Sequence, residues 1–257
     1  MKIILVPSSS AGSGPEHFQF TSSAIVNDTV AIDAGCLGFY RSAQEQARVR
    51  HVLISHTHID HVASLPIFVE NAYEGKADCV MIYGSGEVLD SCQRDLFNDR
   101  IWPDFIALSK NSERPFMRMA RLDPGQTVEL DGLRYTAVAL DHVVPTSGFV
   151  VEDEHSAVAF VSDTGPTEEI WRVANANPKL KAVVLEACFP NSLAWLADVS
   201  KHLTPALVGI ELKKLTRPVR VLAVHIKARF QGQVIAELND LKHPGLEIAQ
   251  FGVPYTF

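Results

Sequence analysis

A short apolar strand that runs directly into a group of histidines is the feature that most limits how this chain can fold. The run Val52–Ser55 has the length and apolar character of a β-strand, and the sequence HTHIDH follows it at residues 56–61. Apolar residues at Val62, Leu65 and Val69 then recur at helical spacing. The histidine cluster therefore lies at a strand-to-helix junction.

The spacing within the cluster suits metal binding. His56 and His58 are two residues apart in extended backbone, so both imidazoles point to one side and can share an ion. Asp60 and His61 follow in the first helical turn, where they are available to a neighbouring ion. Imidazole and carboxylate ligands suit zinc, with manganese or iron as substitutes. A catalytic metal explains this density of histidines better than a structural metal or a metal-free role.

Three more polar residues stand directly after apolar strands. Each alone has about even odds of being structural, because polar residues commonly end strands. Together with the cluster, they predict further metal ligands at the same edge of a sheet. They are His142 after Tyr135–Leu140, Asp163 after Ala157–Val161, and His225 after Val219–Val224.

The organisation of the chain indicates one domain over residues 1–257. Short strands, tight turns and helices alternate, and we find no linker long enough to separate two domains, no internal repeat and no low-complexity tract. The pairs Asn27-Asp28 and Asp131-Gly132 each lie between short apolar strands and predict β-hairpins. Antiparallel hairpins therefore mix with helical crossovers.

Composition restricts the partners of the chain. Its formal net charge of −7 disfavours a long nucleic acid, whereas a small anionic substrate can be held by a metal or by a few local cations. The four cysteines form no C-x-x-C pair and are expected to be reduced. We find no apolar run near the roughly 20 residues of a membrane span and no secretory core, so we expect no membrane association and a cytoplasmic location.

The order and spacing of the seven candidate ligands resemble those of the metallo-β-lactamase superfamily. The resemblance implies an α+β fold, an αββα sandwich of two mixed β-sheets flanked by helices, with two divalent metal ions at the sheet edge. It also implies two ligand sets that share a bridging aspartate. The sets are His56, His58, His142 and Asp163 for the first ion, and Asp60, His61, Asp163 and His225 for the second.

Three more residues match this superfamily. Asp33 resembles its early aspartate, which orients metal-binding histidines; otherwise it is a turn residue before Gly35. Glu186 ends an apolar strand and His202 precedes a helix start, like the pair with which the phosphodiesterase branch protonates a leaving oxygen. The alternative is that Glu186 forms a surface ion pair and that His202 is a polar residue flanking a helix.

Several strings are similar to class II 3′,5′-cyclic-nucleotide phosphodiesterases, above all HLTP at 202–205 and WPD at 102–104. The resemblance implies hydrolysis of cyclic AMP, cyclic GMP or both to 5′-monophosphates by a metal-bridging hydroxide, with Asp60, Glu186 and His202 as catalytic residues. It also implies a helical insertion over about 72–125. Trp102 in that segment is a candidate for stacking on a base or for simple packing.

Other functions stay open at this point. The same fold carries other phosphodiesterases, RNA-processing endonucleases, thioesterases and β-lactamases, and a non-catalytic metal or nucleotide binding module is a further alternative. Lys227 and Arg229 could pair with a phosphate or be solvated surface charges. A homodimer is expected only because it is the commonest assembly.

Overall fold

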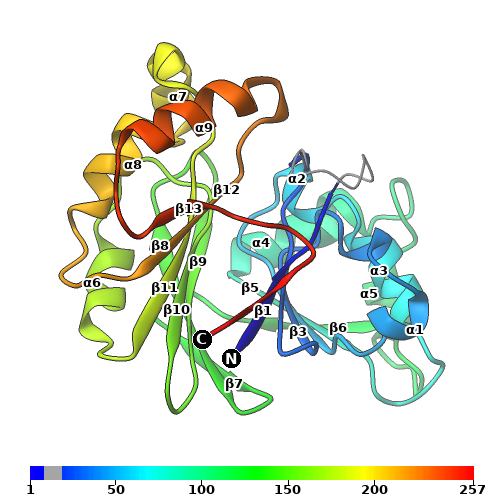
Figure 1. The fold of residues 1–257 in the computed structure, drawn as a ribbon. Coiled ribbons are helices and arrows are strands. Elements are labelled where there is room, and N and C mark those ends of the chain that lie inside the picture. Colours follow the sequence, from blue (N-terminus) through cyan, green and yellow to red (C-terminus); the bar gives the residue numbers. More distant parts are fainter. Residues whose placement is uncertain (9–18) are drawn as a thin grey trace.

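Two β-sheets face each other, and helices lie on their outer sides (Figure 1). The structure is a computed structural model and describes residues 1–8 and 19–257. The first sheet has the strand order β14-β1-β2-β3-β4-β5-β6. Its strands are β1 (Lys2–Leu5), β2 (Ala24–Val26), β3 (Val30–Ile32), β4 (His51–Leu53), β5 (Val80–Gly84), β6 (Met117–Arg121) and β14 (Pro254–Thr256).

The second sheet, of order β13-β12-β11-β10-β9-β8-β7, repeats the pairing pattern of the first. In each sheet four strands pair antiparallel and the next three continue in parallel. This confirms the expected sandwich of two mixed sheets. The strands are β7 (Thr127–Leu130), β8 (Leu133–Leu140), β9 (Thr146–Glu152), β10 (Ala157–Val161), β11 (Leu180–Glu186), β12 (Arg220–Val224) and β13 (Leu246–Ile248).

The helices form two groups, one for each sheet (Figure 1). None of those in the described part of the chain is long and apolar enough to cross a membrane. Beside the first sheet lie η1 (Leu37–Phe39), α1 (Ala43–Gln46), α2 (Ile59–Val62), α3 (Leu65–Ala72), α4 (Gly86–Ser91), the π-helical turn η2 (Cys92–Leu96) and α5 (Phe105–Ser109). Beside the second lie α6 (Glu169–Ala176), η3 (Asn191–Leu193), α7 (Ala194–Ser200), α8 (Pro205–Leu212), η4 (Ala228–Phe230) and α9 (Gln231–Asp240).

Three apolar clusters hold these layers together. Tyr135 and Phe149 belong to the cluster between the two sheets. Phe68 of α3 belongs to the cluster between the first sheet and its helices, and Trp171 of α6 to the cluster on the other side. Because burial of large side chains is the main favourable term in folding, these interfaces fix the sheets relative to each other and so fix the edge that carries the histidines.

Both predicted hairpins are confirmed. Asn27 and Asp28 have φ of 47° and 64° in the β2–β3 turn, and Asp131 and Gly132 have φ of 49° and 80° in the β7–β8 turn. Positive φ at both central residues is the geometry of the type I′ turn, which matches the twist of the strands that it joins.

The helix expected after the histidine cluster is divided into α2 and α3. Ser64 lies between them, and its hydroxyl donates to the carbonyl of Ala34 at 2.7 Å while accepting from the amide of Gly38 at 2.9 Å. These bonds hold the chain where the helix is interrupted. The segment 72–125, expected to be a helical insertion, contains α4, η2 and α5 but also β5 and β6, which lie at one side of the first sheet.

Candidate metal centre

The candidate ligands gather because several strands end at one edge of the sandwich. His142 follows β8, Asp163 follows β10 and His225 follows β12. These three strands run in the same direction, since β10, β11 and β12 are parallel and β8 is related to β10 through the antiparallel strand β9. His56 comes from the first sheet, just after β4. The site thus lies across the two sheets.

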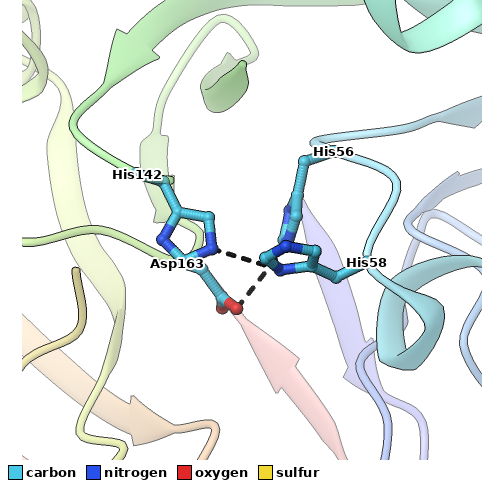
Figure 2. A group of neighbouring side chains, drawn as sticks. All are labelled: His56, His58, His142 and Asp163. Carbon is cyan, nitrogen blue, oxygen red and sulfur yellow. Dashed lines mark hydrogen bonds and ion pairs between the residues drawn. The ribbon is translucent and has the colours of Figure 1, made fainter. Parts of the chain in front are cut away.

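The first group contains His56, His58, His142 and Asp163, whose ligand atoms all lie within 4.8 Å of one another (Figure 2). Nε2 of His142 is 3.2 Å from Nδ1 of His58, and Nε2 of His56 is 3.7 Å from Oδ2 of Asp163. This is the set expected for the first ion.

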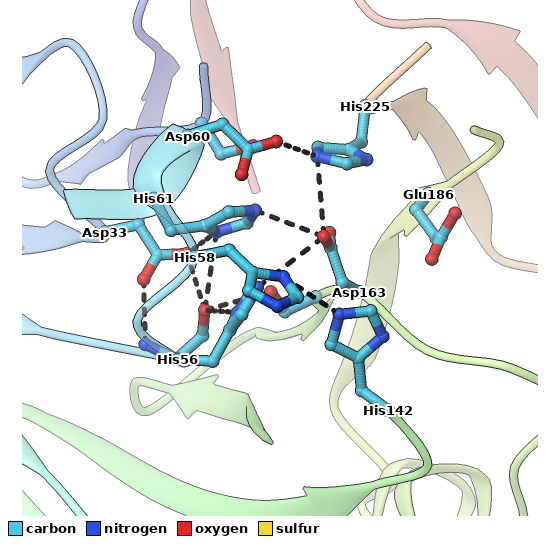
Figure 3. Close-up of polar contacts among 12 residues, drawn as sticks. Asp33, His56, His58, Asp60, His61, His142, Asp163, Glu186 and His225 are labelled. Carbon is cyan, nitrogen blue, oxygen red and sulfur yellow. Dashed lines mark hydrogen bonds and ion pairs between the residues drawn. The ribbon is translucent and has the colours of Figure 1, made fainter. Parts of the chain in front are cut away.

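The second group contains Asp60, His61 and His225, also within 4.8 Å of one another. Oδ2 of Asp163 lies 3.4 Å from Nε2 of His61 and 3.5 Å from Nε2 of His225 (Figure 3). The carboxylate of Asp163 therefore stands between the two groups, where a bridging ligand would be required.

Divalent ions fit this arrangement of donor atoms. Nε2 of His56 and Nε2 of His61 are buried and have no hydrogen-bond partner in the described part of the chain. An unsatisfied buried polar atom costs about 1 to 3 kcal/mol, so two such atoms that face the same carboxylate call for a ligand. Imidazole nitrogen and carboxylate oxygen are donors that zinc, manganese and iron accept.

A small hydrogen-bond network orients the buried histidines from behind. Oδ2 of Asp33 lies 2.7 Å from Nδ1 of His61 and accepts from the hydroxyl of Ser55 at 2.8 Å. That hydroxyl is also 3.0 Å from Nδ1 of His56. Nε2 of both histidines is thereby turned towards Asp163, which is how metal-binding histidines are commonly fixed. Ser55 was missed from the sequence, although its place at the end of the strand was a signal.

Three residues at this edge have left-handed backbone. Asp33, Lys201 and His225 have φ of 58°, 52° and 57°, in the left-handed region that side chains other than glycine seldom adopt. The carbonyl of Lys201 accepts from Nδ1 of His142 at 2.9 Å, so this strained residue fixes one ligand from behind. Such strain collects at functional sites.

The charge states of the clustered side chains favour cation binding. Burial lowers the pKa of His56 well below its usual range, which keeps that imidazole neutral and its lone pair free. For His61 burial acts in the same direction, but Asp163 and Asp33 outweigh it and raise the pKa well above its usual range. Although burial opposes it, the charges of His225 and His61 hold the pKa of Asp163 well below its usual range. Negative charge therefore persists at the centre, and a cation that binds to His61 displaces its proton.

Glu186 and His202 form a buried pair beside the ligands. Oε1 of Glu186 lies 2.8 Å from Nδ1 of His202, and the carboxylate is only 1% exposed, which excludes a surface ion pair. The ring centroid of His202 is 5.0 Å from that of His142 and 5.6 Å from that of His225. Burial would lower the pKa of His202, but Glu186 outweighs it and raises the pKa.

Three other candidates have different surroundings. Nζ of Lys227 lies 3.0 Å from Oδ2 of Asp60, so this cation adjoins the second group. Arg229 is exposed, with its guanidinium 6.0 Å from the ring centre of Phe230. Trp102 is half-buried and packs against the cluster between the first sheet and its helices.

Comparisons with known proteins identify the family of this chain. The model of the beta-lactamase superfamily domain matches residues 30–226. A Yersinia pestis protein with the name probable 3′,5′-cyclic-nucleotide phosphodiesterase is 28% identical over 77% of this chain, and the match spans 65% of that protein, just under two thirds of its length. A 3′,5′-cyclic-nucleotide phosphodiesterase of Aliivibrio fischeri is 25% identical over 82% of this chain and 68% of its own.

Solved structures share the fold at low sequence identity. Unliganded yeast PDE1 matches with a TM-score of 0.77 at 17% identity, over 98% of both chains. The metallo-beta-lactamase fold protein YhfI from Bacillus subtilis matches with a TM-score of 0.71 at 17% identity, over 99% of this chain and 98% of its own. Because the family model covers most of the chain and the fold agrees, the chain belongs to the beta-lactamase superfamily.

Proposed function

We propose that this chain is a metal-dependent phosphodiesterase that hydrolyses 3′,5′-cyclic nucleotides, cyclic AMP, cyclic GMP or both, to 5′-monophosphates. The observation that carries the proposal is the buried Glu186–His202 pair, whose histidine ring lies against the rings of His142 and His225. A proton donor at that position suits the departure of an alkoxide. The names of the Yersinia and Aliivibrio relatives support the same substrate class.

Within this proposal, His56, His58, His142 and Asp163 hold one divalent ion and Asp60, His61, Asp163 and His225 hold the other. When bound, such ions neutralise charge on a phosphoryl group and lower the pKa of a water molecule. The residues of the chain supply the rest. Asp33 and Ser55 keep two buried histidines in position through the bonds described above, and Asp60 adds negative charge on the side that faces Lys227.

His202 is proposed to protonate the leaving ribose 3′ oxygen. Its Nδ1 is engaged by Glu186, so Nε2 is the atom that can deliver the proton. Glu186 itself cannot turn away, because it accepts the amide of Thr164 at 2.9 Å and the amide of Leu203 at 3.1 Å. A carboxylate in this place orients the imidazole and favours its charged form.

A groove beside the proposed metal ligands can hold the base and ribose of the nucleotide. It has a volume of about 330 Å³ and is lined by Thr57, between two ligands in sequence, and by Val144, two residues after His142. Its other wall comes from α4 and η2, with Glu87 and Arg94 among the lining residues. Carboxylate and guanidinium groups here would face the base and ribose of a nucleotide whose phosphate lies at the metal centre.

The test is hydrolysis of cyclic AMP, cyclic GMP and bis(p-nitrophenyl) phosphate by metal-loaded protein. Asp163→Ala should abolish turnover, whereas Asp198→Ala, which changes an exposed aspartate of α7, should not. Formation of a 5′-monophosphate from either cyclic nucleotide is the expected result. Turnover of bis(p-nitrophenyl) phosphate alone would reject cyclic nucleotides as the substrate but support a phosphodiesterase. No turnover of any of the three would reject the proposed activity.

A further inference from the structure

A third group of metal-binding side chains lies beside the two already described. It consists of Glu186, Cys188, His202 and His225, all buried, with ligand atoms within 4.8 Å of one another. Cys188 has no part in the proposed reaction, and it is 0% exposed. Its presence changes the donor chemistry, because the other two groups contain only nitrogen and oxygen donors.

The backbone places the thiol of Cys188 firmly at this position. Cys188 comes two residues after the end of β11, and its amide donates to the carbonyl of Leu203 at 3.0 Å. Its own carbonyl accepts from the amide of Lys227 at 3.3 Å. The residue is thus held between the loop that carries His202 and the loop that carries His225.

An unpartnered nitrogen points to a ligand here. Nε2 of His225 lies 3.2 Å from Oδ2 of Asp60 and 3.5 Å from Oδ2 of Asp163, whereas its Nδ1 is buried and has no hydrogen-bond partner among residues 1–8 and 19–257. Figure 3 shows that the other side of this ring faces Glu186. His225 is 7% exposed, so water does not readily satisfy that nitrogen.

We infer that Glu186, Cys188, His202 and His225 form a third metal site, which takes a soft divalent ion such as zinc or cadmium. Thiolate, imidazole and carboxylate are donors that zinc accepts in tetrahedral sites. Zn–S and Zn–N bonds of about 2.3 and 2.0 Å place neighbouring donors roughly 3.3 to 3.6 Å apart, so the four side chains need a modest contraction. Binding forms the metal–sulfur bond and releases the thiol proton to solvent.

Occupation of this site would inhibit the enzyme, an effect that rests on the proposed function. An ion coordinated by His202 removes the group that protonates the leaving oxygen, and general acid help is worth about 10²- to 10⁴-fold. Hard ions such as manganese prefer oxygen and nitrogen donors and leave the thiol alone. Excess zinc or cadmium should therefore inhibit, and excess manganese should not.

The test follows cadmium binding to the manganese-loaded protein by ultraviolet absorption, which detects a cadmium–thiolate charge-transfer band. The expected result is a band that saturates at one cadmium per chain in the wild type and is absent in Cys188→Ala. Cys79→Ser is the matched control, because Cys79 is not buried like the other three cysteines and is the one that would bind cadmium adventitiously. This control should keep the full band.

Manganese content and circular dichroism establish that Cys188→Ala is folded and binds manganese. Cys188→Ser is a second variant for the cadmium titration. A wild type without the band, or a band that survives in both Cys188 variants, would overturn the third site. Turnover adds a separate readout, because cadmium should lower it by about 10²-fold or more in the wild type and far less in Cys188→Ala. Inertness of every variant towards phosphodiesters would overturn the proposed function, while the band would still decide the third site.

Discussion

Oε1 of Glu186 lies 2.8 Å from Nδ1 of His202, at the end of β11 and within the buried part of the sheet edge. The carboxylate accepts two backbone amides as well, so its position is set by the fold before any substrate binds. The fold therefore fixes a carboxylate beside His202 and so influences whether this imidazole is protonated. This influence can be tested through pH, because the carboxylate raises the pKa of His202.

Replacing Glu186 by Gln should move the alkaline limb of the kcat–pH profile to lower pH. The amide oxygen can keep the bond to His202, although the NH2 group then faces the amide of Leu203. Because the charge is lost, the pKa of His202 falls and its protonated form disappears at lower pH. The shift should be about 1 unit or more, as for an imidazole that loses a neighbouring opposite charge. Steady-state kinetics across pH on metal-loaded protein measure it, and identical profiles for the two proteins would contradict the assignment.

Replacing His202 by Ala should lower turnover by about 10²- to 10⁴-fold and leave the metal content unchanged. The imidazole lies beside the predicted ligands, and its Nδ1 is engaged by Glu186. His155→Ala is the control, since the side chain of His155 is 89% exposed. Elemental analysis alongside kinetics separates the two roles, and a parallel loss of metal and activity would show that His202 is chiefly a ligand.

Replacing Asp33 by Asn should weaken metal binding by about 10- to 100-fold, the usual effect of losing a group that orients a ligand. Asp33 holds Nδ1 of His61 and the hydroxyl of Ser55, which in turn contacts His56. Asp131→Asn is a matched control, because both aspartates have positive φ, which Asn tolerates. Competition with a chromogenic chelator measures affinity, and equal affinities for the two variants would refute the orienting role.

Most of the candidate site could be predicted from the sequence because its residues stand directly after apolar runs. His142, Asp163 and His225 each follow a buried strand of one sheet, and parallel strands bring their carboxyl ends to one edge. Ser55 also stands at the end of an apolar run, but neither its role nor that of Cys188 follows from such a position. Their roles depend on which side chains face them across loops, and no local spacing records that.

Several of the strands that were not predicted have a weak local pattern, although β5, an apolar run, was also missed. β6 reads Met-Arg-Met-Ala-Arg, with two charged residues in five, and β13 has only half-buried residues. Their place in the sheets depends on partners far along the chain. β14 is the extreme case, since Thr256 pairs with Lys2. Such pairings are enforced by the packing of whole layers rather than by propensity.

Replacing Gly35 by Ala should destabilise the protein by about 1 to 3 kcal/mol or more and lower its metal affinity. A Cβ there would lie 2.0 Å from the carbonyl oxygen of Asp60 and 2.8 Å from that of Ser22, both backbone atoms. The turn that carries Asp60 and His61 would have to move. Gly232→Ala, which meets nothing within 4 Å in α9, should be neutral or stabilising by up to about 1 kcal/mol. Urea unfolding of the metal-free proteins compares them, and equal free energies of unfolding would contradict the close approach.

Replacing Lys227 by Met should strengthen binding of the second metal ion. Nζ of Lys227 lies 3.0 Å from Oδ2 of Asp60, so the ammonium group stands where it repels a cation held by that carboxylate. At this range and an effective dielectric near 20, the repulsion between the two cations amounts to several kcal/mol before relaxation, so an increase of at least about tenfold is expected. Lys227→Arg keeps the charge and should bind the ion like the wild type.

Calorimetric titration with manganese resolves this second binding step. Because Met is unbranched and close to Lys in length, the substitution preserves packing along the side chain while removing the charge and the hydrogen bond to Asp60. An unchanged or weaker second step in Lys227→Met would mean that the ammonium group chiefly holds Asp60 in its ligating orientation. In that case Lys227→Arg should bind the second ion more tightly than Lys227→Met does, and the order of the two variants decides between repulsion and orientation.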